Sequence, residues 1–348
     1  MPRKLEEMTD EEFVEYCYQR LLGRPGDPNG RGHWLKMLRG QELSRLDLLE
    51  IFIESDEARN RWESPFLRFA PPGHFLSPLP AIEDVENYEQ IVSAARSRPD
   101  IAGIDLRVME QIALLKEFAA YYKEQPFTEQ PSKTCRYYFA NDSYIYQDGL
   151  VLYCFLRHYR PRRVIEIGAG FSSAVMLDTN ELFFGGAIDL TFIEPYPQRL
   201  RSLLRKSDEV RIVEHKVQEI PISEFSRLEK NDILFVDSSH VVKLGSDVSY
   251  ILFEVLPALK PGVLIHFHDI FWPFEYPREW YAEGRAWNEI HVLRAFLSYN
   301  ISFEILCFNS YMAMFHRDLL SQLMPLALKG TGGSLWIRKI TIPQKPPC

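Results

Sequence analysis

The sequence contains few cysteines, and it has no long run of apolar residues. Its five cysteines, Cys17, Cys135, Cys154, Cys307 and Cys348, are scattered, so they indicate neither a disulfide framework nor a zinc knuckle. No apolar stretch approaches the ~20 residues that span a bilayer. The basic start of the chain also lacks the apolar centre of a secretory signal. A cytoplasmic location without membrane insertion is therefore expected.

An excess of positive charge is also missing. The chain has 40 Lys and Arg against 48 Asp and Glu, which gives a formal net charge of −8. This balance argues against a nucleic acid as the main partner. The 348 residues, 46% of them hydrophobic, suffice for one large globular domain and a smaller one.

The first part of the chain, residues 1–62, predicts a small helical module. Thr9 followed by Glu12 fits a capping box, and apolar residues then recur at helical spacing. Residues 23–32 are rich in glycine and proline and predict a loop. Two further helices are expected over residues 33–38 and 44–55.

The pattern LLGR-x-x-D-x-x-G at Leu21–Gly30 resembles a bacterial domain of unknown function found in surface-associated and glycan-related proteins. A module of this kind can recruit a protein partner or a second copy of the chain. Asp27 and Asn29 within the pattern have the chemistry of a small calcium site. A polar turn that caps the next helix is the favoured interpretation.

A linker and a second, larger domain follow. Residues 63–104 form the expected linker, with prolines concentrated at 65–80. The second domain is expected over 105–348, with its core at about 141–340 and a helical extension in front. Strand-like and helix-like segments alternate through this core, which predicts a doubly wound α/β sheet covered on both faces. The strands after the first are expected at residues 190–195, 210–215, 232–237, 263–269, 301–308 and 334–340.

The segment VIEIGAGFSSAVML, residues 164–177, predicts a buried strand, a tight turn and the start of a helix. Gly168 and Gly170 lack a Cβ, so a ligand can approach the main chain closely. A dinucleotide fingerprint requires a third glycine, and Ser173 stands in its place. Glu166 would moreover repel a diphosphate, so the corner suits a ligand with a cationic end.

Three further polar groups end predicted strands. Glu194 lies 28 positions after Glu166 (194 − 166) and can accept both ribose hydroxyls of a nucleoside. Asp237 ends the segment DILFVD, and His268-Asp269 ends VLIHFHD. Open α/β sheets bind their ligands at the carboxyl ends of the strands, so these groups are expected to face one site.

This ordered set resembles the class I S-adenosylmethionine-dependent methyltransferases, which have a Rossmann-like, mostly parallel sheet of seven strands. The resemblance implies S-adenosyl-L-methionine as cofactor and an antiparallel last strand. It places the amino-acid end of the cofactor at the glycine corner and the ribose at Glu194. The cofactor-binding residues that it implies are Glu166, Gly168, Gly170 and Glu194. Ser172 and Asp237 are expected to join them, and Tyr144, which precedes the corner, could close the cofactor site from the other side.

Within this family the chain is similar to the metal-dependent catechol-type O-methyltransferases. Asp237 matches their first metal-binding aspartate, and His268 with Asp269 takes the positions of their Asp-Asn pair. A histidine is a softer ligand that suits Zn, Fe, Ni or Mn better than Mg. The candidate ions are Mg, Mn, Fe and Zn. The alternative is direct proton removal by a histidine. The catalytic residues under either interpretation are His240, His268 and Asp237, and the metal ligands would be Asp237, His268 and Asp269.

An aromatic stretch after Asp269 predicts a loop over the carboxyl edge of the sheet. Its residues Trp272, Tyr276, Trp280 and Trp287 could line a pocket for a small-molecule or sugar acceptor of a methyl group on oxygen. Two other enzyme classes remain open on a related fold, a metal-dependent hydroxylase and a nicotinamide-linked oxidoreductase. A non-catalytic binding protein is the third alternative.

Overall fold

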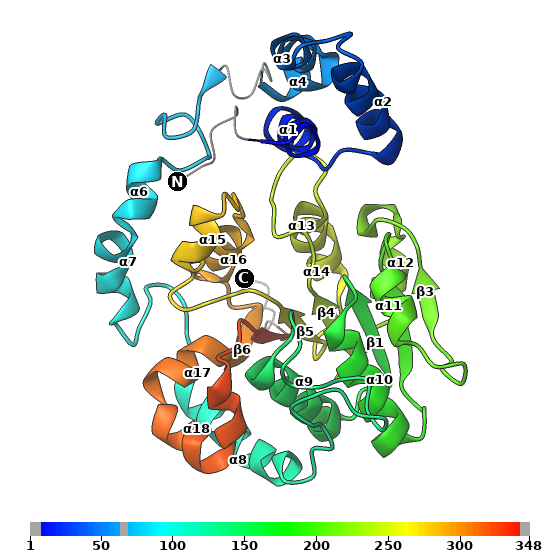
Figure 1. Cartoon of the computed structure of the whole chain (residues 1–348). Helices are drawn as coiled ribbons and strands as arrows, with labels where there is room; N and C mark the ends of the chain where they lie inside the picture. Colours follow the sequence, from blue (N-terminus) through cyan, green and yellow to red (C-terminus); the bar gives the residue numbers. More distant parts are fainter. Residues whose placement is uncertain (1–7, 63–68, 342–348) are drawn as a thin grey trace. The chain divides into compact units, whose positions relative to one another are not determined.

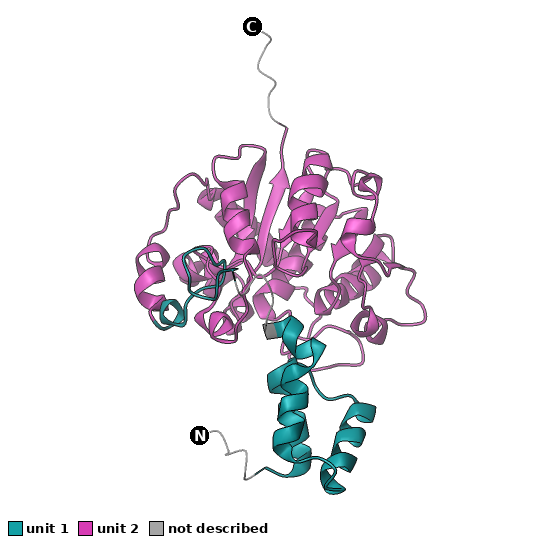
Figure 2. Cartoon of the chain, turned by 90° about the horizontal axis from the view of Figure 1, so that it is seen from above, with its two compact units in different colours: residues 1–86 teal, residues 87–348 magenta. Residues whose placement is uncertain are grey.

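The computed structural model describes residues 8–62 and 69–341, and it divides the chain into two compact units, residues 1–86 and 87–348 (Figure 2). The predicted linker, residues 63–104, is divided between the two units. Its first residues, 63–68, lie outside the described part. Two helices, α6 (Ile82–Glu86) and α7 (Tyr88–Arg96), lie in the remainder.

Unit 1 is helical. Thr9 and Glu12 form the expected capping box at the start of α1, and Ser44 with Asp47 forms a second one at α3. A small core around Phe13, Cys17 and Phe52 packs these helices together. The helices before α6 are α1 (Asp10–Cys17), α2 (Pro28–Arg39), α3 (Arg45–Glu54) and α4 (Asp56–Trp62), with a π-helical turn at Tyr18–Leu22.

The loop predicted over residues 23–32 is wrong in its second half, because α2 begins at Pro28. Asp27 caps this helix by accepting a hydrogen bond from the backbone N–H of Gly30 at 2.8 Å. Proline is favoured at the first helical position, where its missing N–H costs nothing. The acid at position 27 thus acts as the cap that the favoured interpretation expected.

Unit 2 contains one seven-stranded sheet in the order β3-β2-β1-β4-β5-β7-β6 (Figure 1). The first five strands are parallel, and β7 is antiparallel to both β5 and β6. The predicted doubly wound fold of the class I methyltransferase type is confirmed, including its antiparallel last strand. The strands are β1 (Arg163–Ile167), β2 (Asp189–Ile193), β3 (Arg211–Val213), β4 (Ile233–Val236), β5 (Leu264–Phe267), β6 (Phe303–Phe308) and β7 (Leu335–Lys339).

Helices cover both faces of this sheet, so every residue of the central strands β4 and β5 is buried. Helix α9 carries a run of ten buried residues, Gln147–Leu156, which places it inside the unit. The helices of unit 2 after α7 are α8 (Val108–Tyr122), α9 (Tyr146–Tyr159), α10 (Phe171–Phe184), α11 (Gln198–Leu203), α12 (Ile222–Phe225), α13 (Asp247–Tyr250), α14 (Leu256–Ala258), α15 (Arg278–Ala282), α16 (Glu289–Leu297), α17 (Asn309–Phe315) and α18 (Arg317–Leu323).

The last two strands were both expected at a sheet edge because of their mixed polarity. Only β6 lies there, whereas β7 lies between β5 and β6. The polar residues of β7 are Arg338 and Lys339 at its end, and its first three residues are buried. Among the helices of the described residues, none is long and apolar enough to cross a bilayer.

A buried ion-pair network ties the segment before α9 to the helix that follows the glycine corner. The Arg136 side chain, 4% exposed, pairs with Asp178 of α10 at 2.6 Å and with Asp208 at 2.5 Å. Asp178 also accepts the backbone N–H groups of Arg136 and Tyr137. Because α10 starts directly after the glycine corner, this network helps to fix the position of that helix.

Replacing Arg136 by methionine should lower the free energy of unfolding by about 3–5 kcal/mol, because the buried Asp178 loses its charge partner. Urea unfolding measures this loss. The matched control is Arg201→Met, which breaks an exposed pair with Glu214 and should cost less than about 1 kcal/mol. Equal losses in the two variants would contradict a structural role for the buried network.

Candidate active site at the carboxyl edge of the sheet

The glycine corner after β1 depends on a residue without a side chain at position 168. Gly168 has φ +81°, and a Cβ on it would lie 1.7 Å from the carbonyl oxygen of Asp237. Its N–H donates to Ile193 O at 3.0 Å, and the N–H of Asp237 donates to Ile167 O at 2.9 Å. The end of β1 is therefore held directly against the ends of β2 and β4.

Glu166 lies completely buried beneath this corner. Its two carboxylate oxygens accept hydrogen bonds of 2.5 Å from the hydroxyls of Ser172 and Ser173 at the start of α10. Ser173 Oγ in turn accepts from the N–H of Gly170 at 3.1 Å. Burial raises the pKa of Glu166 to about 8, against the opposing effect of the two serines. In this conformation Glu166 braces the loop from below, and its direct contact with the cofactor stays a prediction.

Glu194 reaches the same corner from the end of β2. Its Oε2 accepts from the N–H of Ala169 at 3.1 Å, and its Oε1 accepts from the N–H of Tyr196 at 2.8 Å. Each carboxylate oxygen has a second lone pair available. The residue thus fixes the loop and keeps acceptor capacity for the predicted ribose contact.

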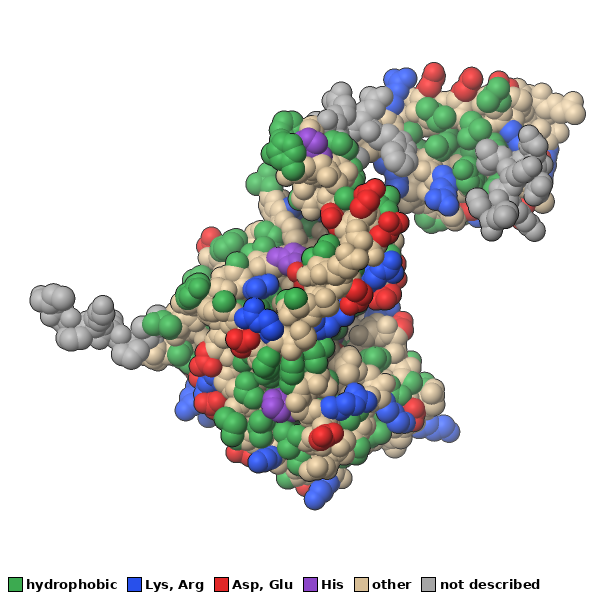
Figure 3. All heavy atoms as spheres, turned by 90° about the vertical axis from the view of Figure 1, so that its left-hand side faces the viewer, with side chains coloured by type: hydrophobic (Ala, Val, Ile, Leu, Met, Phe, Trp, Pro, Cys, Tyr) green, Lys and Arg blue, Asp and Glu red, His purple; other side chains and the backbone are tan. Residues whose placement is uncertain are grey.

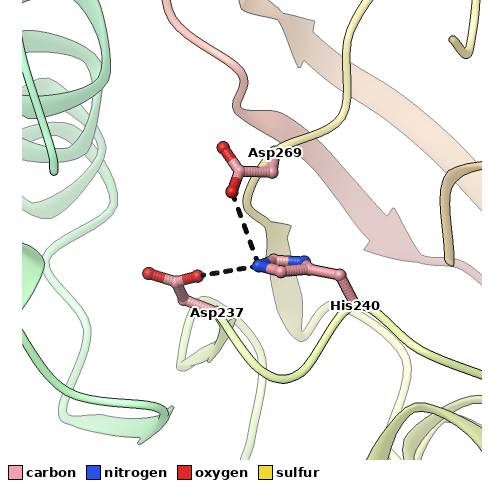
Figure 4. A group of neighbouring side chains, drawn as sticks. All are labelled: Asp237, His240 and Asp269. Atoms are coloured by element: carbon pink, nitrogen blue, oxygen red, sulfur yellow. Dashed lines mark ion pairs between the residues drawn. The ribbon is translucent and has the colours of Figure 1, made fainter. Parts of the chain in front are cut away.

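His240 is the centre of an acidic cluster at the ends of β4 and β5 (Figure 4). Its Nε2 lies 3.5 Å from Asp237 Oδ1 and 3.4 Å from Asp269 Oδ2. Its Nδ1 lies 2.8 Å from Oε2 of the buried Glu289, at the start of α16. One ligand atom each from Asp237, His240 and Asp269 lie within 4.8 Å of one another. The chain therefore brings together a possible donor set of two carboxylates and one imidazole.

Two of these residues have an unusual backbone conformation. His240 has φ +59° and Asp269 has φ +58°, a region that non-glycine residues seldom adopt. The carbonyl oxygen of His240 accepts the N–H groups of Asn288 and Glu289, both at 3.1 Å. These bonds connect the turn after β4 to the start of α16 and hold the imidazole in place.

The charges of the cluster shift several pKa values. Burial alone would lower the pKa of His240, but its hydrogen bonds to Asp237 and Glu289 raise it well above its usual value. Burial would raise the pKa of Asp237, and the nearby His268 and His240 outweigh it and lower that pKa. Burial raises the pKa of Asp269 in spite of the same two histidines. The cluster thus places several carboxyl groups around one imidazole, and these carboxyl groups stabilise the protonated form of His240.

The two histidines of β5 and its end differ in surroundings. His268 Nε2 lies 3.4 Å from Asp269 Oδ1, so His268 borders the cluster, while His240 faces both aspartates. His266 is completely buried, stacks on Phe235 at 3.8 Å and bonds Ser334 Oγ through Nε2 at 2.9 Å. Burial and the neighbouring His268 lower the pKa of His266 well below its usual value, which keeps it neutral in the core.

The aromatic residues expected to line an acceptor pocket fall into two groups. Trp287 lies 4.5 Å from the His240 ring, and it packs with Trp280 and Tyr276 at 5.2 and 5.8 Å between ring centroids. Trp272 instead contacts Tyr311 at 4.9 Å, in the core beside β6. The segment is not wholly a loop, since α15 lies within it. Only the first group is close to the cluster.

Tyr144, the remaining expected cofactor residue, is buried behind this edge of the sheet. Its ring centroid lies 5.1 Å from that of His268 and 5.9 Å from that of Phe235. The side chain thus borders the acidic cluster, and its contact with a cofactor stays a prediction.

Family comparison agrees with this architecture. Residues 165–270, which run from β1 to the end of β5 and include Glu166, Asp237 and Asp269, match the family model of a methyltransferase domain. Together with the seven-stranded sheet, this match identifies a methyltransferase domain of the class I S-adenosylmethionine-dependent type in unit 2. S-adenosylmethionine is accordingly its methyl donor, and the match favours a methyltransferase over the hydroxylase, the nicotinamide-linked oxidoreductase and the non-catalytic binding protein. Residues 2–62 match the domain of unknown function DUF4214, which confirms the resemblance of the N-terminal module.

Individual proteins similar to this chain give less information about its function than the family model does. An uncharacterized protein of Archaeoglobus fulgidus is 36% identical over 166 residues, which are 47% of this chain and 75% of that protein. The O-methyltransferase TomG from Streptomyces achromogenes, solved with S-adenosylmethionine, is 13% identical, with coverage of 74% and 99% of the two chains and a TM-score of 0.35. The Podospora anserina methyltransferase PaMTH1 is 17% identical, with coverage of 76% and 98% and a TM-score of 0.34. These low values transfer no property of those proteins to this chain.

The sequence reasoning missed Glu289 as a site residue of the methyltransferase. It stands 49 positions after His240, at the end of the aromatic stretch, and nothing in its local pattern marks it. A search for a carboxylate partner of each candidate histidine would have included Glu289, but only as one of many acidic residues. Only the fold brings α16 to the turn after β4.

Replacing Gly168 by alanine should strongly destabilise the corner, because the added Cβ would collide with the Asp237 carbonyl and φ +81° disfavours a side chain. We expect a lower melting temperature together with at least tenfold weaker binding of S-adenosylhomocysteine, roughly the effect of 1.4 kcal/mol. Gly170→Ala is the matched control for stability, since its Cβ would meet only Arg199 Cδ at 3.9 Å. A Gly168→Ala protein as stable as Gly170→Ala would refute this account.

Glu166 should make the ligand-free protein less stable as the pH rises. The folded pKa of about 8 lies above the usual 4.5, so the folded state retains a proton that the unfolded chain releases. Stability is therefore full below about pH 4.5 and falls until about pH 8. In Glu166→Gln this fall disappears, so the variant should gain roughly 3–5 kcal/mol over the parent between pH 5 and pH 8. If the free energies of unfolding of the parent and of Glu166→Gln, measured with urea, differ by the same amount at every pH from 5 to 8, a raised pKa of Glu166 is excluded.

Proposed function

We propose that this methyltransferase transfers the methyl group to an oxygen of a small-molecule or sugar acceptor, and that Asp237, His240 and Asp269 hold a divalent metal ion beside it. The convergence of these three side chains at the ends of β4 and β5 carries the proposal. Their place next to the glycine corner supports it, because methyl transfer requires an acceptor in line with the sulfonium methyl.

The donor set fits a divalent cation. Donor atoms about 2.1 Å from one ion lie about 3.0–3.5 Å from each other, and His240 Nε2 lies 3.5 and 3.4 Å from the two aspartate oxygens. Glu289 holds the other ring nitrogen of His240, as carboxylates commonly do for metal-binding histidines. Mixed imidazole and carboxylate donors suit Mn, Fe or Zn, and the carboxylates alone suit Mg.

When bound, such an ion would orient an acceptor hydroxyl and lower its pKa. Glu289 keeps Nε2 of His240 directed toward the reacting side, and the two aspartates offset the positive charge there. The alternative, that His240 itself takes the hydroxyl proton, uses the same geometry, with Glu289 orienting the base. His240 is therefore the residue on which both versions of the chemistry depend.

The acceptor side of the site is aromatic. Trp280 and Trp287 pack edge to face near His240, and the Arg285 guanidinium lies 4.7 and 5.0 Å from their ring centroids. Aromatic faces of this kind bind sugar rings and planar phenols, so both remain acceptor classes of the proposal. For Trp272 the packing near Tyr311 supports a structural role instead.

Further predictions concern the partners of this protein and its location in the cell. A role of the N-terminal module in binding a protein partner or a second copy, and a cytoplasmic location, stay predictions. The absence of a nucleic-acid partner also stays a prediction, which rests on the net charge of −8. On the face shown in Figure 3, acidic and basic side chains are interspersed.

Metal binding can be tested without knowing the acceptor. Mn²⁺ titrated into the metal-free protein should bind by calorimetry, and Asp269→Ala or His240→Gln should weaken binding by at least about tenfold. His215→Gln is the control, because His215 is exposed and pairs with Glu219, outside the acidic cluster. Affinity for S-adenosylhomocysteine should stay unchanged in all variants.

A methyl-transfer assay against phenols, catechols and sugars then separates the two mechanisms. The metal proposal expects activity to vanish on chelation and to return with Mn²⁺ or Mg²⁺, and to vanish in His240→Gln. Full activity after rigorous chelation, combined with an inactive His240→Gln, would replace the metal by the histidine base. Activity in His240→Gln would reject both.

A further inference from the structure

A buried carboxylate outside the acidic cluster controls the segment that leads into β7. Asp148, 3% exposed, stands in the first turn of α9. Its Oδ2 accepts from the N–H of Gly333 at 3.1 Å, and its Oδ1 accepts from the N–H of Ser334 at 3.1 Å and from Asn309 Nδ2 at 2.8 Å. Three donors thus converge on one acid that has little contact with solvent.

The preceding residue strengthens the same attachment. Gln147 accepts the N–H of Gly332 at 3.0 Å and donates to the carbonyl oxygen of Asn309 at 3.0 Å. Its backbone N–H donates to Gly330 O at 3.3 Å. A Cβ at Gly332 would lie 2.0 Å from Asp148 Oδ1, so the backbone passes so close to this carboxyl group that no side chain fits at position 332. Residues 330–334 are therefore fixed by the Gln147-Asp148 pair.

This segment in turn touches the acidic cluster. Gly333 O accepts the N–H of Ile270 at 2.7 Å, the residue directly after Asp269. A Cβ at Gly333 would lie 3.1 Å from Asp269 Cα and 2.7 Å from the Phe271 ring. Ser334 Oγ also bonds His266 at 2.9 Å. The backbone around Asp269 is thus held between β5 and the segment that Asp148 fixes.

We propose that Asp148 is a positioning residue, which anchors residues 330–334 and thereby keeps Asp269 in its left-handed conformation within reach of His240. The role of Asp269 in this statement rests on the proposed function. Without the anchor, Gly333 is free to move away, and the turn at Asp269 loses the support that offsets its unfavourable φ. A shift of about 1 Å in a reacting group can lower the rate by about a hundredfold.

Asp232 provides a matched control. It is 2% exposed and accepts three backbone N–H groups, from Arg162, Arg163 and Glu229, at 2.9–3.0 Å. It lies before β4, at the amino end of the same sheet, away from the cluster. Asp→Asn at either position turns an amide N–H₂ toward a backbone donor, so both variants should lose stability for the same reason.

The test compares Asp148→Asn with Asp232→Asn by amide hydrogen exchange and by methyl transfer. In Asp148→Asn, exchange at Ile270 should speed up by at least about tenfold. In Asp232→Asn, exchange should speed up at the three N–H groups that Asp232 accepts, those of Arg162, Arg163 and Glu229, and not at Ile270. With the acceptor found in the methyl-transfer assay, Asp148→Asn should lower kcat by at least about tenfold with KM and S-adenosylhomocysteine affinity unchanged. Unchanged exchange at Ile270, or an equal fall of kcat in Asp232→Asn, would overturn the proposal.

Two further variants keep the outcomes separate. If Asp148→Asn does not fold, Gly333→Ala keeps the Asp148 side chain and places a methyl group 3.1 Å from Asp269 Cα, so it should lower kcat in the same way. Normal kcat in a folded Gly333→Ala protein overturns the positioning role. Asp269→Asn is measured in parallel. If it is fully active, the proposed function of Asp269 fails, while the exchange at Ile270 still decides whether Asp148 anchors the segment.

Discussion

The site is built on the close approach of Gly168 to the carbonyl group of Asp237. Any side chain at position 168 would enter the space of that oxygen, at 1.7 Å from its Cβ. The contact joins the glycine corner, where the cofactor is predicted to bind, to the strand end that carries the first acid of the cluster. Both halves of a transfer reaction are therefore fixed on one rigid edge of the sheet, where a donor and an acceptor can be held in line.

The acidic cluster forms beside this corner because the carboxyl ends of β4 and β5 lie at the same edge of the sheet. Asp237, Asp269 and Glu289 surround one imidazole, and three carboxylates so close together repel one another unless a positive charge lies between them. In the ligand-free protein the protonated His240 supplies that charge. A divalent cation would supply such a charge as well, with the neutral imidazole as one of its ligands.

Much of this could be predicted from the sequence, because the signals are local. Apolar strands, the Gly-x-Gly corner and acids at strand ends predicted the fold and most of the residues at this edge, and the resemblance of this ordered set to class I methyltransferases implied the cofactor. Glu289 and Asp148 were missed because their partners lie 49 residues and more than 160 residues away along the chain. The loop predicted over residues 23–32 extends five residues into α2. Glycine and proline, which usually interrupt helices, are frequent there, but the cap at Asp27 and the proline at position 28 start a helix instead.

Backbone strain explains why such distant residues matter. His240 and Asp269 both adopt left-handed conformations, which cost of order 1 kcal/mol or more each and persist only where neighbours enforce them. For His240 the enforcement comes from two N–H groups at the start of α16, and for Asp269 it comes from the segment held by Asp148. The geometry of the cluster is thus set by the packed interior before any ligand arrives. Little reorganisation is then left for the reaction step, and that is the condition under which fixed charges contribute most to catalysis.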